Sequence, residues 1–400
     1  MKKILVLVGV LFVFLAFSNI FQFLPEKFDS LFYVPDLTQF YDALKKTNTG
    51  DVFINQIGLE QMVLGILEQQ LMMQNYTLDD LDLFKELLVA STVDGSAVIA
   101  IGPSKDPQKI KEIFEAFSGM QFPSEVLVKD GYFVFSNLPF GGKLPNKVKE
   151  NIEKGYLAVS YVNTNEDLKV EGYGYARLEG NTFRLYNEIV PKDQETKDFI
   201  LDLEKQQGKD ILSDNKIGGD LFIFLNKKIP KSLLKLLTNV TEEMNVDLNK
   251  FLEDFSGTAY ISANISDFIL NALSGMQQST VPFYGVVYYS GLNWDDLEGI
   301  SKFEVINGKK YGVEVTEEGT PVVYVNLESD KMTLYGISPE QYTPGDRTFI
   351  EQNYSDDYFF GVLLNLNPTI FNFIGVDTEA YLKIQVYAKD GKIFAKSVLK

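Results

Sequence analysis

The stretch IQVYAKDGKIFAKS, residues 384–397, places two segments of alternating apolar and polar residues on either side of Asp390-Gly391. A two-residue type I′ turn needs positive φ at both central residues, and Asp-Gly adopts that conformation at little steric cost. The stretch therefore predicts an antiparallel hairpin of strands 384–389 and 392–397.

Three earlier stretches repeat this pattern around Asp94-Gly95, Asp130-Gly131 and Glu179-Gly180. Each pair has strand-like runs rich in β-branched and aromatic residues on both sides. The expected strands are Ala90–Val93 with Ala97–Ile101, Val126–Lys129 with Tyr132–Phe135, and Tyr173–Leu178 with Thr182–Asn187.

Segments with helical periodicity interrupt the hairpins. Helical segments are expected from Leu37 through Leu88, most clearly over Ile57–Met73, where apolar residues recur near helical spacing. Pro107 opens another expected helix, and the carboxylate of Asp106 would accept its free backbone N–H groups. Two further helices are expected, at Thr196–Gln207 and Lys231–Phe255.

The order of these elements predicts an internal duplication. Ser30–Pro35 would open the first copy and Asp220–Asn226 the second. The expected matches are Ser256–Ser262 and Phe283–Tyr289 with the Asp94-Gly95 hairpin, Tyr311–Val315 and Pro321–Asn326 with the Asp130-Gly131 hairpin, and Asp357–Asn367 with Gly155–Asn163.

Antiparallel hairpins interrupted by helices predict an α+β fold. We expect two similar domains, at residues 24–190 and 219–400, each an antiparallel sheet packed with helices. A charged segment at 191–218 would connect them.

The composition excludes several classes of chemistry. The 400 residues contain no Cys and no His, which excludes disulfides, thiolate nucleophiles and imidazole bases. With 37 Lys+Arg against 55 Asp+Glu, the net charge of −18 argues against a nucleic-acid partner. We therefore expect no cofactor and no enzymatic constellation, and the sequence nominates no catalytic, cofactor-binding or metal-binding residue.

The N-terminal segment, residues 1–23, predicts export. Lys2 and Lys3 precede the apolar run Ile4–Phe23, which is the order of a secretory signal, and cleavage after Ser18 would suit the small residues there. The alternative is an uncleaved anchor, because 20 residues match the length of a spanning helix. The expected location is extracytoplasmic: periplasmic or secreted after cleavage, or held at the cytoplasmic membrane by residues 1–23.

The segment LPEKFDSLFYVPDL, residues 24–37, together with the leader and the duplicated halves, resembles a family of bacterial cell-envelope proteins of unknown function. The resemblance covers residue 24 to the end of the chain. It implies an extracytoplasmic protein, and it carries no catalytic residues to this sequence.

Three Ser-x-x-Lys matches, at Ser213–Lys216, Ser232–Lys235 and Ser397–Lys400, fit the nucleophile pattern of penicillin-binding enzymes. The accompanying Lys-Thr-Gly strand is absent. The most similar tripeptide in the sequence is Lys46-Thr47-Asn48. Chance matches are expected in a lysine-rich chain, so we interpret them as incidental.

Several acidic or glycine-rich stretches have structural explanations. Asn163–Asp167 has alternating oxygen ligands but lacks the glycine and distal Glu of a calcium loop, which favours a turn. Asp79–Asp82 and the group Asp295, Asp296 and Glu298 are interpreted as helix starts. Gly141–Lys143 lacks the phosphate-loop pattern.

Tyrosine and phenylalanine are abundant and alternate on several strands, as at Tyr173/Tyr175 and Tyr284/Tyr288. Sheet packing explains this pattern, and a ligand-binding aromatic groove is the alternative. The leading hypothesis is an exported or anchored cell-envelope protein with a non-enzymatic structural or interaction role. The alternatives are a binding protein for a hydrophobic or lipid-like ligand and a carboxylate-dependent hydrolase. The expected partner is an envelope protein or a small hydrophobic molecule, with membrane contact through residues 1–23 if these are retained.

Overall fold

The computed structural model describes residues 19–77, 85–118, 126–165, 168–228, 255–266, 281–297, 300, 302–316, 319–366, 375–376 and 378–400. The chain separates into two compact units. Unit 1 takes the described residues up to Lys46, with Phe53–Thr164 and Glu171–Leu178; unit 2 takes Thr47–Val52, Asn165–Val170 and Glu179–Lys400.

All 18 strands of the described chain belong to one antiparallel sheet. The prediction of two separate α+β domains is therefore wrong. The decisive contact joins β8 (Thr182–Pro191) to β18 (Lys392–Leu399), which pair from Phe183↔Leu399 to Ile189↔Ile393. These strands close the two predicted copies, and pairing them removes edges that separate domains would leave open. Alternation along a strand does not reveal which edges meet.

The ladder of unit 1 follows the order β4-β5-β3-β2-β1-β6 among the described strands. A further strand, β7 (Lys169–Glu179), contributes residues to both units. The remaining bounds are β1 (Ser30–Val34), β2 (Glu86–Ser91), β3 (Ala97–Gly102), β4 (Leu127–Lys129), β5 (Tyr132–Ser136) and β6 (Ala158–Asn165).

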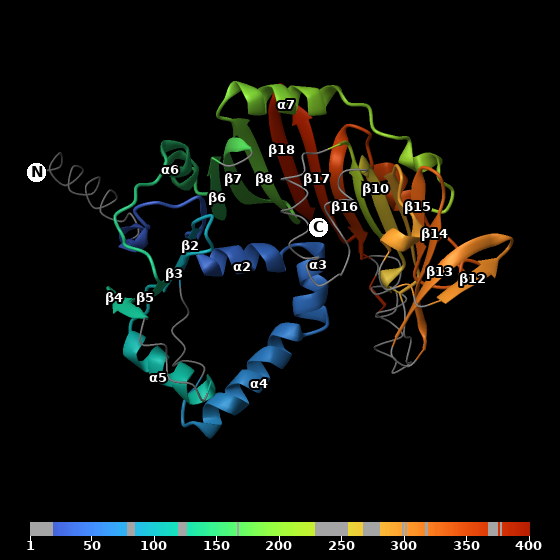
Figure 1. Cartoon of the computed structure of the whole chain (residues 1–400). Coiled ribbons are helices and arrows are strands. Elements are labelled where there is room, and N and C mark those ends of the chain that lie inside the picture. Colours follow the sequence, from blue (N-terminus) through green and yellow to red (C-terminus); the bar gives the residue numbers. More distant parts are fainter. Residues whose placement is uncertain are drawn as a thin grey trace, which may run out of the picture. The chain divides into compact units, whose positions relative to one another are not determined.

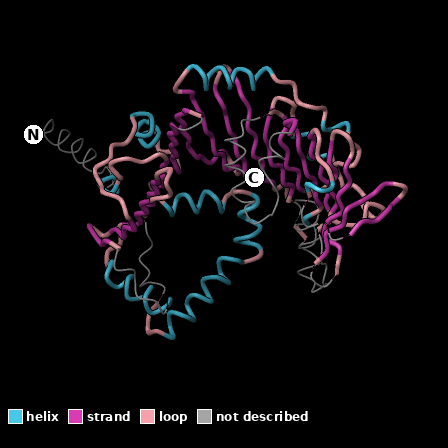
Figure 2. The backbone as a smooth tube through the Cα atoms, in the orientation of Figure 1, coloured by secondary structure: helices cyan, strands magenta, loops and turns pink. Residues whose placement is uncertain are grey.

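The ladder of unit 2 follows the order β8-β18-β17-β16-β9-β10-β11-β15-β14-β13-β12, and its strands follow one another as magenta tubes in Figure 2. Their bounds are β9 (Leu221–Asn226), β10 (Phe255–Ala263), β11 (Phe283–Tyr289), β12 (Lys302–Ile306), β13 (Lys309–Val315), β14 (Pro321–Leu327), β15 (Lys331–Tyr335), β16 (Tyr358–Asn365) and β17 (Tyr381–Lys389).

The strand order repeats between the two units. The order β5-β3-β2-β1-β6 of unit 1 has the counterpart β15-β11-β10-β9-β16 in unit 2. By position, β4 and β5 match β14 and β15. The predicted match of the Asp130-Gly131 hairpin with Tyr311–Val315 and Pro321–Asn326 therefore lies one strand too early.

Two of the predicted Asp-Gly turns have positive φ at both residues. The values are 53° and 83° at Asp130-Gly131, and 53° and 70° at Asp390-Gly391. At Asp94-Gly95 only the glycine has positive φ, because a longer loop connects the strands there. The Asp94 carboxylate stabilises this loop by accepting hydrogen bonds from the Thr92 hydroxyl and the Ser96 N–H.

The helices of the described chain are α2 (Leu37–Lys45), α3 (Asn48–Gly50), α4 (Leu59–Met73), α5 (Pro107–Ser118), α6 (Asn146–Glu153), α7 (Gln194–Lys205) and α11 (Thr348–Asn353), with a π-helical turn at Asp51–Gln56. The predicted helices at Ile57–Met73, Pro107 and Thr196–Gln207 are confirmed as α4, α5 and α7. Asp106 caps α5 by accepting from the Lys109 N–H at 3.1 Å. The expectation of helix through Leu88 is wrong because Glu86–Ser91 forms β2, and the helix predicted from Lys231 lies outside the described residues up to 254.

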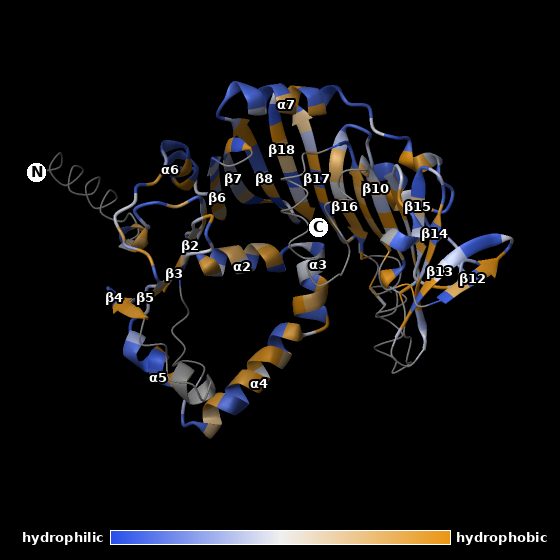
Figure 3. Cartoon of the chain, in the orientation of Figure 1, coloured by the Kyte–Doolittle hydropathy of each residue, from blue (hydrophilic) through white to orange (hydrophobic). Residues whose placement is uncertain are grey.

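The apolar residues whose spacing predicts α4 are mostly exposed. Leu71 is buried, whereas Met62 is 53% exposed and Leu64 41% exposed. Figure 3 shows apolar residues along the whole of α4. No helix among the described residues is long and apolar enough to cross a membrane.

Helix α7 packs against one face of the unit 2 sheet, over β8, β18 and β17 (Figure 1). Ile200 and Leu203 of the helix are buried against Ala388 and Ile393. The opposite face of the same sheet carries Phe222 and Phe224 of β9 and is covered by Ile217 and Ile350. This second face holds the candidate site.

The N-cap of α7 gives a pH-dependent prediction. Asp193 accepts a hydrogen bond from the Thr196 N–H at 2.9 Å and pairs with Lys169 at 3.0 Å. These contacts, the Thr196 backbone first, lower the pKa of Asp193 from 3.8 to about 2. Because the folded-state pKa is depressed, the stabilisation is complete above the unfolded value near 3.9 and is lost as the pH falls towards 2.

We expect Asp193→Ala to lower the thermal midpoint by a few degrees at pH 7, because the helix loses its cap. The difference from the parent chain should shrink as the pH falls from 4 to 2, as measured by circular dichroism melts. Asp202→Ala removes the same charge from an exposed position of α7 and is the control. A difference that persists at pH 2 would contradict the assignment.

Candidate functional site

A polar pocket of about 520 Å³ lies on the second face of the unit 2 sheet. This volume is in the range of small-molecule sites, about 300–1,000 Å³. We call it the tyrosine pocket, and its lining residues are Asp210, Ser213, Asp214, Asn215, Lys216, Tyr260, Tyr284, Tyr288, Lys309, Tyr311, Asn326, Glu328, Lys331, Thr333 and Tyr335.

The strand pairing places the tyrosines on one face. Tyr284 of β11 is paired with Tyr335 of β15, and Val286 of β11 lies between Tyr260 of β10 and Thr333 of β15. Since side chains alternate between the two faces of a strand, residues an even number of positions apart, such as Tyr284 and Tyr288, point the same way. The wall of the pocket is the segment 210–216, which contains the 3₁₀ turn η4 (Ile211–Ser213).

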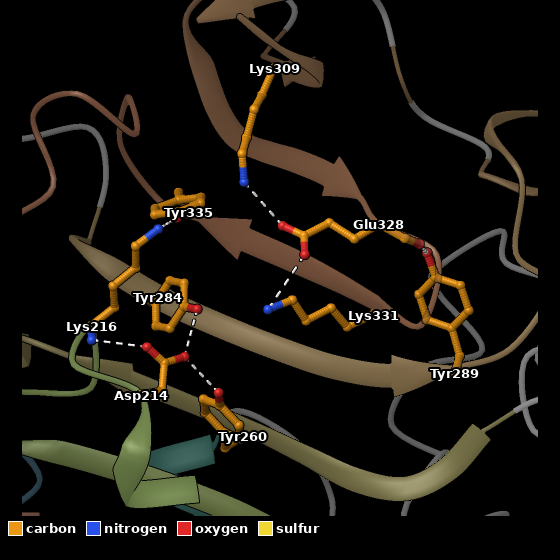
Figure 4. Close-up of polar contacts among 9 residues, drawn as sticks. All are labelled: Asp214, Lys216, Tyr260, Tyr284, Tyr289, Lys309, Glu328, Lys331 and Tyr335. Carbon is orange, nitrogen blue, oxygen red and sulfur yellow. Dashed lines mark hydrogen bonds and ion pairs between the residues drawn. The ribbon is translucent and has the colours of Figure 1, made fainter. Parts of the chain in front are cut away.

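Asp214 ties the wall to the strands (Figure 4). Its Oδ2 accepts hydrogen bonds from the hydroxyls of Tyr260 and Tyr284, each at 2.7 Å. Its Oδ1 accepts from the backbone N–H of Lys216 at 3.0 Å. Both carboxylate oxygens are therefore used inside the protein.

Burial and the Asp214 carboxylate raise the pKa of Tyr260 and of Tyr284 above the ordinary value of 10.0. Burial also raises the pKa of Tyr335, with Asp214 adding to the effect. All three hydroxyls are consequently protonated at neutral pH. Each of these buried side chains contributes a neutral hydroxyl group to the lining of the site.

The side chain of Lys216 lies among the tyrosines. Its ammonium donates a hydrogen bond to the Tyr335 hydroxyl oxygen. It also lies 5.5 Å from the centroid of the Tyr284 ring and 5.1 Å from that of Tyr335. A cation at this distance from an aromatic face is attracted by the ring quadrupole, which helps to hold the ammonium in the pocket.

Glu328 lies between two lysines at another part of the lining (Figure 4). Its oxygens are 3.2 Å from Nζ of Lys309 and 3.5 Å from Nζ of Lys331. Burial opposes ionisation, but the two ammonium groups together outweigh it and lower the pKa of Glu328. Glu328 is therefore an ionised group at neutral pH.

The corresponding face of unit 1 is apolar. Its strands present buried residues such as Leu88, Val98 and Val134, and η1 (Asn19–Phe23) covers them with Ile20 and Phe23. These side chains fill the space with a hydrophobic core. The strand arrangement alone therefore does not create a polar pocket; the tyrosines and Asp214 of unit 2 do.

A second, apolar pocket of about 360 Å³ lies within unit 1. Phe21, Leu24, Leu144 and Ile152 supply apolar lining, and the last of these belongs to α6. Charged residues also line it: Lys143, Lys149 and Glu153.

The predicted Ser-x-x-Lys pairs do not form nucleophile–base pairs in the described chain. Ser213 and Lys216 both line the tyrosine pocket, but the Ser213 hydroxyl donates to the Asp210 carbonyl at 2.7 Å while Lys216 contacts Tyr335. Ser397 lies on β18, and the ammonium of Lys400 pairs with Glu379. Ser232–Lys235 lies outside the described residues.

The structure describes only some residues of the acidic stretches named in the sequence analysis. Asn163–Asn165 ends β6, whereas residues 166–167 and Asp79–Asp82 lie outside the described chain. Asp295 and Asp296 lie in the short 3₁₀ turn η5 (Trp294–Asp296), and Glu298 is not described. Within the described residues, no three acidic side chains gather in a way that could hold a metal ion.

Sequence reasoning identified part of the site. The alternation of Tyr284 and Tyr288 gave the aromatic-groove alternative, and both residues line the pocket. It missed Asp214, Glu328 and the convergence of Tyr260 with Tyr335. These residues are up to 121 positions apart along the chain, between Asp214 and Tyr335, and only strand pairing brings them together.

Comparisons of this chain with models of known protein families, with curated proteins and with solved structures gave no match. The functional argument therefore rests on the geometry of the site.

Proposed function

We propose that the chain is an exported or membrane-anchored cell-envelope protein that binds a small polyhydroxylated ligand, such as a saccharide, without converting it. The observation that carries this proposal is the group of protonated tyrosines around the tyrosine pocket. The leader pattern of residues 1–23 supports a location outside the cytoplasm.

Saccharides suit this lining for two reasons. The half-buried ring of Tyr288 offers an apolar surface for the C–H face of a sugar, and the phenol oxygens of the lining accept hydrogen bonds from its hydroxyl groups. The amide of Asn326, the hydroxyl of Thr333 and the three lysines add polar groups from several directions. Pockets that combine aromatic walls with convergent polar groups are typical ligand sites.

A hydrolytic role receives less support from these residues. A carboxylate hydrolase needs a general acid whose pKa is raised, and Glu328 is shifted in the opposite direction. Asp214 uses both oxygens to hold Tyr260, Tyr284 and its own loop. We therefore propose binding rather than catalysis.

We also propose that the repeated strand order arose by internal duplication. The same face is a hydrophobic core in unit 1 and a polar pocket in unit 2. Binding would then be a property of the second copy.

The test is isothermal titration calorimetry with α-1,4-galactobiose and α-1,4-digalacturonate, on the chain without residues 1–18. Tyr288→Ala removes a half-buried ring from the lining and should weaken binding about tenfold. Tyr358→Ala removes a half-buried tyrosine that is not among the lining residues and should leave the affinity unchanged. Absence of heat with both sugars at millimolar concentration would overturn the proposal.

The apolar pocket of unit 1 favours a second candidate function, the binding of a hydrophobic or lipid-like ligand. Phe21, Leu24, Leu144 and Ile152 would surround an acyl chain, and Lys143 and Lys149 would meet an anionic head group. Displacement of a fluorescent fatty acid tests this candidate. Ile152→Asp should abolish the displacement signal, and an unchanged signal would reject the site.

A further inference from the structure

We infer that the tyrosine pocket selects a saccharide that carries a carboxylate or a phosphate, and that Lys216 and Tyr335 bind this acidic group. The inference rests on the proposed function and specifies the class of ligand. It follows from which hydrogen-bonding groups of the pocket are already used inside the protein.

The carboxylate of Asp214 is satisfied by internal donors. Tyr260 and Tyr284 each have a single hydroxyl hydrogen, and both donate it to Asp214. Toward a ligand, these two phenols can therefore only accept. They suit the hydroxyl hydrogens of a sugar and not its acidic group.

The pair Lys216 and Tyr335 has the opposite character. The ammonium has three hydrogens, and one of them goes to the Tyr335 oxygen. The hydroxyl hydrogen of Tyr335 and two hydrogens of Lys216 remain for other acceptors. A cationic donor beside a neutral donor is a suitable arrangement for an anionic oxygen pair.

The Glu328 cluster adds positive charge to the same lining. One carboxylate there faces two ammonium groups, those of Lys309 and Lys331, so the cluster carries a surplus of one positive charge. Asp210 is the remaining acid of the lining and is exposed, where water and salt screen its charge. Over the whole lining three lysines balance three acids, so the pocket is formally neutral in a chain whose net charge is −18.

The measurement compares matched acidic and neutral sugars by isothermal titration calorimetry. The pairs are α-1,4-digalacturonate with α-1,4-galactobiose, and galactose-1-phosphate with galactose. We expect each acidic sugar to bind about tenfold more tightly at low salt, and this advantage to decrease at about 0.5 M NaCl because the charges are then screened. The carboxylate and phosphate pairs distinguish the two kinds of acidic group.

Lys216→Met keeps most of the apolar stem and removes the charge. It should reduce the affinity for the acidic sugar about tenfold more than that for the neutral sugar, so that the preference for the acidic sugar is lost. Tyr335→Phe should weaken the acidic sugar in the same direction. Lys396→Met is the matched control, because Lys396 also lies over a tyrosine ring, 5.2 Å from the centroid of Tyr387, but is not among the lining residues.

Each outcome separates the inference from the proposed function. If acidic and neutral sugars bind equally, the inference is wrong and saccharide binding stands. If none of the four sugars binds, the proposed function itself fails. If Lys216→Met retains the full preference for acidic sugars while its melting curve matches the parent, the assignment to Lys216 is wrong.

Discussion

A chain carrying Asp214→Ala is expected to lose about 2–5 kcal/mol of unfolding free energy and to bind no saccharide in the tyrosine pocket. Tyr260 and Tyr284 are only 5% and 2% exposed, and Asp214 is the acceptor for both of their hydroxyl groups. Each buried hydroxyl left without an acceptor costs about 1–3 kcal/mol. The loop 210–216 also loses its attachment to β10 and β11, and Lys216 leaves its position beside Tyr335.

Urea unfolding and calorimetric titration measure the two effects. Asp214→Asn keeps one carbonyl oxygen as an acceptor and should lose less stability than Asp214→Ala. Asp210→Ala is the matched control, because Asp210 also lines the pocket but lies exposed. We expect it to change stability by less than about 0.5 kcal/mol.

A double-mutant cycle isolates the phenol contacts from other effects of the alanine. In a Tyr260→Phe/Tyr284→Phe background no hydroxyl is left to satisfy, so Asp214→Ala should cost less there than in the parent chain. An equal cost in both backgrounds would show that the tyrosine contacts do not account for the loss.

Local chemistry was sufficient to predict several elements. The turn at Asp390-Gly391 follows from the φ values that two adjacent residues must adopt, and the start of α5 from a carboxylate three residues before an unsatisfied N–H. The Asp94-Gly95 turn differs because the Thr92 and Ser96 contacts build a longer loop. The two turn residues alone do not reveal such competing side-chain hydrogen bonds.

The other features of the fold and the site depend on pairing between strands that are far apart in the sequence, which the sequence alone does not predict. The β8–β18 ladder that makes one sheet of the chain depends on two strands about 200 residues apart, and each reads as an ordinary hairpin strand. The site depends on similar pairings between β10, β11 and β15. In the sequence, Lys216 belongs to a Ser-x-x-Lys match. In the structure its ammonium contacts tyrosines and not Ser213.

Gly218→Ala is expected to displace the wall of the tyrosine pocket. A Cβ at this position would lie 2.2 Å from the carbonyl oxygen of Gly345, and that neighbour is backbone, which cannot rotate away. The adjacent Gly219 N–H donates to the Asp346 carbonyl at 3.0 Å, so the two segments are held together there. Relief of the clash must therefore move the chain that leads back to Lys216 and Asp214.

We expect the substitution to cost about 1–3 kcal/mol of stability, as overpacking usually does, and to weaken saccharide binding at least tenfold. The control is Gly65→Ala, because a Cβ there meets nothing within 4 Å and the residue lies inside α4. That variant should gain about 0.5–1 kcal/mol, since alanine is the better helix former, and should bind as the parent does. If Gly218→Ala retained both its stability and its affinity, the close packing of Gly218 on Gly345 would not be what positions Asp214 and Lys216.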